Sequence, residues 1–255
     1  MATGGNNDNS SNNFINFSGV PYPGLNIRLA DETLENRKMR AVRLLLGAAR
    51  RSVVLTACPQ LQVLPRHYSK IYTKTGDKGT SSTFTGARKA KDDKIFHALG
   101  STDELSCLIG VAAEYCVEAK LDMEDKLTQI QCILQDVGSN VATPLSTARD
   151  AHLKKVVFNK NYVPQLEAWI DELTAQLPPL KNFILPSGGK CATHLHLARS
   201  VCRRAEREIT ALVREGEIDQ ETYRFMNRLS DYLFSAARFA AMKEGKEEMI
   251  YRRIE

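Results

Sequence analysis

Five segments repeat apolar residues at steps of three and four, and this pattern constrains the fold more than any other feature. The segments are residues 92–118, 123–141, 163–177, 191–214 and 222–243. The second has the clearest seam, made of Leu127, Ile130, Leu134, Val137 and Val141. Such spacing places apolar side chains on one face of an α-helix, and alternating steps are typical of near-parallel bundles. We therefore predict an all-α fold, a five-helix bundle of the ferritin-like up-down type.

Prolines and glycines separate these segments. Pro144 follows the second segment, Pro178-Pro179 ends the third, and Pro186-Ser-Gly-Gly precedes the fourth. Such residues end helices and form connections. The strand-like stretch Lys181–Leu185 is short, which predicts an extended connection. With 43% hydrophobic residues in a chain of 255, one large core can form, and we expect a single bundle domain over residues 69–255.

A polar loop precedes the first helical segment. Residues 73–82 read Thr-Lys-Thr-Gly-Asp-Lys-Gly-Thr-Ser-Ser, and Lys91-Asp-Asp follows shortly after. Small residues let backbone N–H groups approach an anion closely, and hydroxyl and ammonium groups add donors. The spacing of a Walker A loop is absent from the sequence. Two interpretations remain, a loop that binds a polyphosphate and a polar turn that leads into a helix.

The fourth segment carries charged residues opposite its apolar seam. Arg199, Arg203, Glu206 and Arg207 fall within an arc of roughly 100° on a helix, and Arg204 lies to one side. Charge runs of this kind are usually solvated faces with internal ion pairs. Four arginines around one glutamate nevertheless leave an excess of positive charge, which favours an anion or a partner carboxylate.

Carboxylates and an amide on two other segments are further candidates for the site. Asn227 and Asp231 lie one turn apart on the fifth segment and share a face. Asp103 and Glu104 lie in the middle of the first segment, where a carboxylate is unusual unless it is paired.

The excess positive charge of the chain lies before the predicted bundle. Residues 1–70 contain nine Lys/Arg against four Asp/Glu, and residues 71–255 contain 26 of each. The predicted bundle therefore has no global basic field that would favour a nucleic-acid partner. No run of about 18 apolar residues exists, so the sequence predicts no membrane span.

The leader has two parts. Residues 1–38 begin with an Asn/Ser/Gly-rich stretch, and we expect a disordered extension. Residues 39–68 are basic, amphipathic and free of acidic residues, which are features of a mitochondrial transit peptide. A basic surface helix or a partner-binding tail is the alternative. Because Met39 directly precedes the basic segment, we hypothesise that translation starts there and that the mature protein begins between Leu55 and Ser69.

The six cysteines form no C-x-x-C pair, which is typical of reduced cysteines in an intracellular protein. Cys191, His194, His196 and Cys202 are the candidates for a metal site. On a helix, residues 194 and 196 project about 200° apart, so both cannot bind one ion. We therefore predict no protein-bound metal cluster.

Six motifs occur in the order in which a known family has them. They are Lys70–Gly79, Lys91-Asp-Asp, Ser101-Thr-Asp-Glu-Leu, Phe183-Ile-Leu-Pro-Ser-Gly-Gly, Arg199-x3-Arg-Arg-Ala-Glu-Arg and Asn227-Arg-Leu-Ser-Asp. In these motifs the chain resembles the PduO-type ATP:cob(I)alamin adenosyltransferases, and the match is strongest to the animal mitochondrial form. The resemblance covers about residues 69–251, and the leader has no counterpart in the bacterial pattern.

The resemblance implies an enzyme that transfers the 5′-deoxyadenosyl group of ATP to cob(I)alamin, an alkyl transfer that releases triphosphate. It also implies a homotrimer with active sites between neighbouring subunits, a mitochondrial matrix location, a separate reductase and product delivery to methylmalonyl-CoA mutase. Mg²⁺ would assist the departure of triphosphate. The alternatives are another ATP-dependent transferase on a helical bundle and a non-enzymatic cobalamin carrier.

The resemblance also implies roles for individual residues. Phe183 would pack against the corrin and displace the lower axial ligand of cobalt, and Arg203 would act on the leaving triphosphate. Asp103 would pair with Arg199 across the subunit interface. The implied ATP-binding residues are Thr73, Lys74, Thr75, Gly76, Ser81, Ser82, Lys91, Arg203, Arg204, Ala205, Glu206, Arg207 and Asn227.

Overall fold

The computed structural model describes residues 14–15, 21–22 and 72–254, and most of these residues are helical. Six helices occur among them: α2 Lys94–Glu118, α3 Glu124–Val141, α4 Asp150–Leu153, α5 Tyr162–Thr174, α6 Gly189–Arg214 and α7 Gln220–Lys243. Two short hairpins complete them: β1 Phe14–Ile15 with β2 Pro21–Tyr22, and β3 Thr80–Ser82 with β4 Arg88–Ala90. Residues from Thr75 onward belong to one compact unit, whereas Tyr72, Thr73 and Lys74 belong to another.

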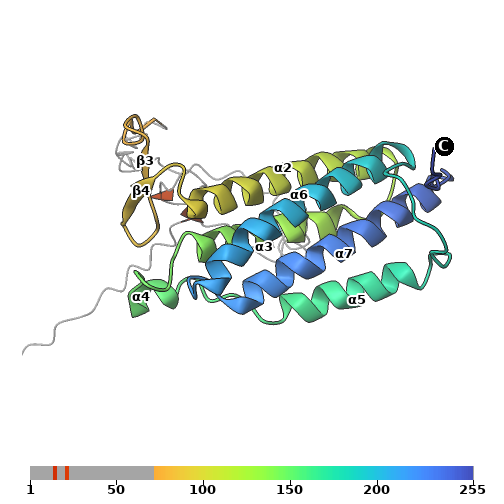
Figure 1. Ribbon diagram of the computed structural model, residues 1–255. Helices are drawn as coiled ribbons and strands as arrows, with labels where there is room; N and C mark the ends of the chain where they lie inside the picture. The colour runs from red at the N-terminus through yellow and green to blue at the C-terminus, as the bar shows by residue number, and fades with distance from the viewer. Residues whose placement is uncertain (1–13, 16–20, 23–71, 255) are drawn as a thin grey trace, which may run out of the picture. The chain divides into compact units, whose positions relative to one another are not determined.

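The predicted apolar seams form the core of this unit. All five residues of the α3 seam are completely buried, and so are Leu195, Cys202 and Ile209 of α6. Helix α2 packs against α3 and α6, and α7 packs against α5 and α6 (Figure 1). The expectation of a mostly helical protein is therefore confirmed for the described residues.

Two ion pairs show the register of α2 on α6. Lys94 at the start of α2 pairs with Glu215, which directly follows α6. Ten residues further along α2, Glu104 pairs with Arg204, which precedes Glu215 by eleven residues. The two helices therefore run antiparallel.

Caps and a tightened turn explain where the helices differ from the predicted ranges. Asp93 and Asp219 accept hydrogen bonds from Ile95 N–H and Glu221 N–H, so α2 begins at Lys94 and α7 begins at Gln220. Helix α5 ends at Thr174 and not at residue 177, because the chain tightens there: Gln176 N–H and Leu177 N–H donate to the Leu173 and Thr174 carbonyls, three residues back.

The start of α6 is set by close packing. It begins at Gly189, directly after Gly188, whose φ of +98° is in the left-handed region. A Cβ at Gly188 would lie 2.5 Å from the Cβ of Ala241, so only glycine allows this approach of the connection to α7.

Three β-type pairings were missed from the sequence, and one of them is the β1–β2 hairpin. The C-terminal part of the predicted polar loop is strand β3, whose residues Thr80, Ser81 and Ser82 oppose Ala90, Lys89 and Arg88. The predicted extended connection at 181–185 also contains a bridge, in which Ile184 pairs antiparallel with Ile250. The all-α description was therefore incomplete, because three-residue strands and single bridges have no detectable periodicity.

The leader predictions fall on residues 1–68, which lie outside the described residues apart from β1 and β2. Cys58 is also outside them. Among the described cysteines, Cys116, Cys191 and Cys202 are buried, Cys107 and Cys132 are exposed, and all five are free thiols. None of the described helices is long and apolar enough to cross a membrane.

Candidate active site

The polar loop is closed around Gly76 and Lys91. Gly79 N–H donates to the Gly76 carbonyl at 3.1 Å, and Lys91 N–H donates to the Gly79 carbonyl at 2.9 Å. A Cβ at Gly76 would lie 3.0 Å from the Lys91 Nζ, so the ammonium group rests directly against this glycine. Two of the predicted ATP-binding residues are therefore brought together, because glycine leaves space for the lysine head.

Arg88 fixes the loop from strand β4, and the sequence analysis did not single it out. Its guanidinium donates to the Thr75 carbonyl at 2.8 Å and to the Thr80 hydroxyl. The side chains of Ser81 and Ser82 are half-buried on β3. Thr73 and Lys74 belong to the other unit, where the Lys74 Nζ lies 5.9 Å from the centroid of the Tyr72 ring.

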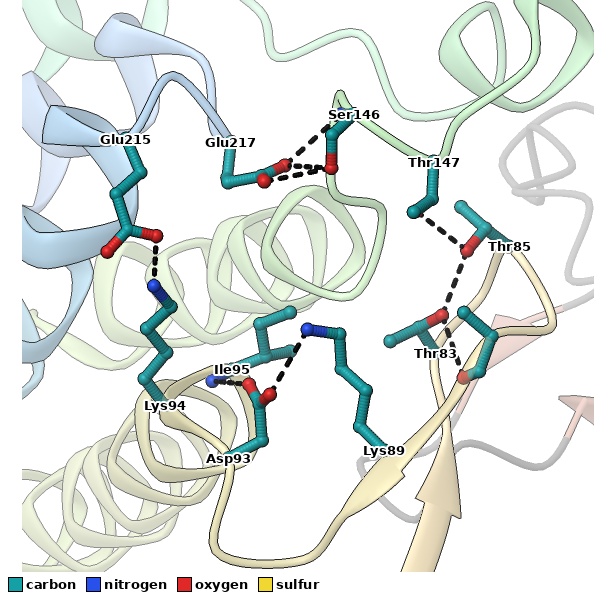
Figure 2. Close-up of polar contacts among 11 residues, drawn as sticks. Thr83, Thr85, Lys89, Asp93, Lys94, Ile95, Ser146, Thr147, Glu215 and Glu217 are labelled. Atoms are coloured by element: carbon teal, nitrogen blue, oxygen red, sulfur yellow. Dashed lines mark hydrogen bonds and ion pairs between the residues drawn. The ribbon is translucent and has the colours of Figure 1, made fainter.

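Asp93 anchors the hairpin to the start of α2 (Figure 2). One carboxylate oxygen accepts from Ile95 N–H at 3.0 Å, and the other lies 3.1 Å from the Lys89 Nζ. Burial opposes ionisation of Asp93, but the Ile95 hydrogen bond and the charges of Lys89 and Lys94 outweigh it and lower its pKa. The hairpin and the helix therefore share one ionised carboxylate.

Hydroxyl groups connect the hairpin to the segment that follows α3 (Figure 2). The Thr83 and Thr85 hydroxyls are 2.9 Å apart, and the Thr85 and Thr147 hydroxyls are 3.1 Å apart. Ser146 in turn donates to the Glu217 carboxylate at 2.8 Å. The loop thus rests on two connections of the bundle as well as on α2.

The arginine face of α6 consists of Arg199, Arg203, Arg204, Glu206 and Arg207. Some of these residues bind neighbouring helices, and others are exposed to solvent. Arg204 pairs with Glu104 of α2, and Glu206 accepts from the Asn227 amide of α7 at 2.8 Å. Arg203 and Arg207 are exposed, and the Arg207 guanidinium donates to the Arg203 carbonyl at 3.0 Å. Two arginines therefore present their charge to solvent, while Arg204 and Glu206 hold neighbouring helices.

Ala205 and Asp231 complete this group of candidate residues. Ala205 is completely buried, so its side chain belongs to the core. Asp231 pairs with Arg228 of the same helix at 3.4 Å.

Asp103 and Arg199 are both half-buried, and no ion pair joins them within the described part of a single chain. Burial raises the pKa of Asp103. Burial and the neighbouring charge of Arg203 lower the pKa of Arg199, whose buried Nε lacks a hydrogen-bond partner there. The Arg199 guanidinium carbon lies 5.8 Å from the Phe234 ring centroid, a cation–π distance.

The loop and the arginine face are separated along the bundle. Arg204 faces Glu104, which lies ten residues beyond Lys94 and hence about 15 Å further along the α2 axis, at 1.5 Å per residue. The loop ends at the level of Lys94. Within one subunit these two groups of predicted ATP-binding residues therefore do not converge on one point.

Phe183 lies in the connection between α5 and α6. Its side chain is 86% exposed, although its carbonyl accepts a hydrogen bond from Tyr251 N–H at 2.8 Å. The ring is thus open to solvent on a backbone that is tied to the C-terminal segment.

A family model described as cobalamin adenosyltransferase matches residues 71–240, which include the loop, the hairpin, Phe183 and the arginine face. The chain belongs to the cobalamin adenosyltransferase family. The resemblance seen in the sequence is thereby confirmed.

Individual relatives agree with this assignment. The mouse corrinoid adenosyltransferase MMAB is 59% identical over 184 residues, which are 72% of this chain and 78% of the mouse protein. The Bacillus subtilis corrinoid adenosyltransferase is 42% identical over 186 residues, covering 72% of this chain and 93% of that protein. Among solved structures, a variant of the PduO-type ATP:corrinoid adenosyltransferase from Lactobacillus reuteri, complexed with cobalamin and ATP, has a TM-score of 0.66 and 38% identity. That comparison covers 72% of this chain and 100% of the Lactobacillus chain.

Proposed function

We propose that this protein transfers the 5′-deoxyadenosyl group of ATP to cob(I)alamin and releases triphosphate. The observation that carries the proposal is the family match, because it spans both the Gly76–Lys91 loop and the Arg203 face. In the proposed step, cobalt forms a bond to the ribose 5′ carbon while the bond from that carbon to the phosphate oxygen breaks. The triphosphate leaves with the electron pair.

Cob(I)alamin is itself a very strong nucleophile, so the protein needs no general base. Its tasks are to align the ribose carbon with cobalt, to exclude water and to stabilise charge on the leaving triphosphate. Lys91 beside Gly76 and the exposed Arg203 and Arg207 supply positive charge for the last task. Arg204 and Glu206 position the neighbouring helices through Glu104 and Asn227.

A homotrimer with shared sites accounts for the separation of the loop from the arginine face. A second copy can bring its own loop to the Arg203 face of the first, and ATP would then bind between subunits. Asp103 and Arg199 support the same arrangement. Each is half-buried, and neither forms an ion pair with another described residue of the same chain. We propose that they pair across the interface.

The Asp103→Asn variant tests this interface. Loss of the carboxylate charge should shift the protein from trimer towards smaller species, because the partner Arg199 would remain half-buried and uncompensated. Size-exclusion chromatography with light scattering measures the mass. The matched variant Glu104→Gln changes a carboxylate that pairs within its own chain and should leave the mass unchanged. An unaltered trimer in Asp103→Asn contradicts the interfacial pair.

Magnesium would act with the triphosphate and not with a protein cluster. The described residues contain no group of three or more His, Cys, Asp or Glu side chains that could hold a metal ion. Mg²⁺ in sites of this kind is usually held by substrate phosphates, water and at most one or two carboxylates. When bound, the ion would neutralise charge on the leaving group, and the lysine and arginine groups would act on the remaining oxygens.

We also propose a mitochondrial matrix location, with residues 39–68 as the transit peptide and residues 1–38 as an upstream extension. A separate reductase would supply cob(I)alamin, and the product would pass to methylmalonyl-CoA mutase. Mass spectrometry of the precursor from cells tests the start at Met39, and abundant peptides from residues 1–38 would exclude it.

The decisive experiment is incubation with ATP, Mg²⁺ and chemically reduced cobalamin. Adenosylcobalamin should appear in the absorbance spectrum together with inorganic triphosphate. Release of pyrophosphate or ADP would indicate another ATP-dependent transferase, and cobalamin binding without product would indicate a carrier.

A further inference from the structure

The backbone of Phe183 is held by a short antiparallel ladder with the C-terminal segment. Tyr251 N–H donates to the Phe183 carbonyl at 2.8 Å, and Leu185 N–H donates to the Met249 carbonyl at 2.7 Å. Ile184 and Ile250 form the bridge between these bonds. The exposed Phe183 side chain therefore extends from a backbone segment that is hydrogen-bonded to the C-terminal segment.

The C-terminal segment is in turn held by a buried arginine of α7. Arg238 is only 7% exposed, and its Nε donates to the Glu248 carboxylate at 2.8 Å. A terminal nitrogen of the same guanidinium donates to the Pro178 carbonyl at 3.0 Å. Arg238 therefore ties both sides of the ladder, because Pro178 precedes Phe183 in the chain and Glu248 directly precedes Met249.

A hydroxyl closes the far end of the ladder. Met249 N–H donates to the Ser187 hydroxyl at 2.9 Å, and that hydroxyl donates to the Leu185 carbonyl at 3.0 Å. The connection from Phe183 to the start of α6 is consequently fixed at both its ends.

These contacts are costly for a segment that only joins two helices. A buried guanidinium loses hydration and is retained where it is paired and hydrogen-bonded. An exposed phenyl ring does not stabilise the fold by burial. We therefore connect the fixed backbone of Phe183 with contact between its ring and another molecule. Holding a group in position before the ligand arrives lowers the entropy cost of the bound arrangement.

We propose that the side chains of Arg238 and Glu248 and the backbone N–H of Tyr251 hold Phe183 in place to displace the lower axial ligand of cobalamin. This inference rests on the proposed function. The ladder acts before the transfer step, when cob(II)alamin loses its lower ligand and a reduced flavin donates one electron to give cob(I)alamin. Binding of ATP and the transfer from cob(I)alamin do not depend on it.

Tyr251→Pro tests the hydrogen bond to Phe183 directly, since proline lacks the N–H donor. Tyr251→Ala is the matched control, because it removes the same ring and keeps the donor. Glu248→Ala, which releases Arg238, is compared with Glu247→Ala at the exposed neighbouring position. None of these substitutions falls in the helical core.

For each full-length variant, absorbance and electron paramagnetic resonance spectra give the fraction of bound cob(II)alamin that lacks its lower ligand. An ATP titration gives the ATP dissociation constant. The reaction rate is measured twice, once from cob(II)alamin with reduced flavin and once from chemically prepared cob(I)alamin. Tyr251→Pro should lower the ligand-free fraction and the cob(II)alamin rate about fivefold, the effect of one lost hydrogen bond. Glu248→Ala should lower both at least as much, because it removes two hydrogen bonds and leaves the buried Arg238 guanidinium without its counter-charge. Their ATP affinity and cob(I)alamin rate should stay within about twofold of wild type, as should every quantity in the controls.

The inference is overturned if Tyr251→Pro retains the wild-type spectrum. It is equally overturned if that variant loses ATP binding and the cob(I)alamin rate to the same degree, since this would indicate general damage to the fold. Failure of the proposed function has a different signature, because the wild-type protein would then make no adenosylcobalamin from cob(I)alamin.

Discussion

The hairpin at one end of the bundle and the Phe183 segment, which pairs with the C-terminal residues, are held by different means. The hairpin is held mainly by side-chain hydrogen bonds. Asp93 caps α2, Arg88 donates to the loop carbonyl of Thr75, and threonine hydroxyls connect the hairpin to its neighbours. At Phe183 a backbone ladder and one buried ion pair, Arg238–Glu248, hold the segment. The difference matches the proposed ligands, because an anion needs oriented polar groups and a corrin needs a fixed apolar surface.

The α6 arginines lie along the helix that connects these two regions. Their level is about 15 Å beyond that of the loop, by the helical rise between Lys94 and Glu104. This separation motivates the proposal that a neighbouring subunit completes the phosphate site, whereas the ladder and the Arg238–Glu248 pair already hold the Phe183 backbone within one chain.

Arg203→Ala should have the largest effect. Removing one charge from a desolvated triphosphate site typically costs about 2–5 kcal/mol, so both ATP affinity and the transfer rate should fall. Calorimetric ATP titration and the cob(I)alamin rate measure the two losses. Arg214→Ala is the matched control, since this exposed arginine lies eleven residues from Arg203, in the last turn of the same helix. Equal, small effects in both variants would show that the arginine face does not contact the triphosphate.

Mildly acidic pH should destabilise the Phe183 region more than the hairpin, because protonation of His196 is unfavourable in the folded protein. This imidazole of α6 is buried, its Nδ1 lacks a hydrogen-bond partner among the described residues, and its ring lies 6.0 Å from Phe234. Burial and the positive charge of Arg199 lower the pKa of His196 to about 4, against an opposing influence of Glu248. Between this value and the ordinary histidine pKa near 6.5, the unfolded chain binds a proton that the folded chain does not. Stability therefore falls as pH falls through that window.

The expected loss in the free energy of unfolding is about 2 kcal/mol between pH 7 and pH 5. Urea unfolding at both pH values and at one protein concentration measures it, because the stability of an oligomer such as the proposed trimer depends on concentration. His196→Leu should remove most of the pH dependence, and His97→Leu at an exposed position of α2 should not. An unchanged pH dependence in His196→Leu would show that another group is responsible.

Phe183→Ala should lower turnover from cob(II)alamin at least tenfold, about 1.4 kcal/mol in activation free energy, and leave ATP affinity unchanged. The physical reason is the loss of the apolar group that excludes the lower ligand and water. Steady-state rates with reduced flavin and ATP titration separate the two quantities. Ile254→Ala, at a residue that is 94% exposed, is the control for loss of surface apolar area. Wild-type turnover with an unchanged cobalamin spectrum would exclude the proposed role of Phe183.

The helices could be predicted from the sequence because their seams are buried. Leu127, Ile130 and Leu134 are each completely buried, and their spacing alone identifies a helix and its inner face. Helix ends were less accurate, since they depend on single residues such as the caps Asp93 and Asp219.

The pairing of charged residues could be predicted only in part. A mid-helix carboxylate at Glu104 was expected to be paired, and it pairs with Arg204, but the partner is 100 residues away and follows from the α2–α6 register. Arg88 gave no signal in the sequence. Arg238 did give one, because it interrupts the run of buried alanines Ala236, Ala237, Ala240 and Ala241, where an arginine must have a partner. The bridge between Ile184 and Ile250 was too short to detect.

Asp93→Ala should have the smallest effect and tests how strongly the hairpin depends on side chains. Loss of an N-terminal cap costs about 1 kcal/mol, and the exposed part of the Lys89 pair adds little. Because the pKa of Asp93 is lowered in the folded protein, its contribution is present at neutral pH and is lost as pH falls through that lowered pKa, below the window of His196. Urea unfolding at pH 7 measures the change, with Asp92→Ala at the adjacent exposed position as the control. If the two variants were equally stable, the hairpin would be held by its β3–β4 pairing and hydroxyl contacts alone. The contrast with the backbone ladder at Phe183 would then not hold.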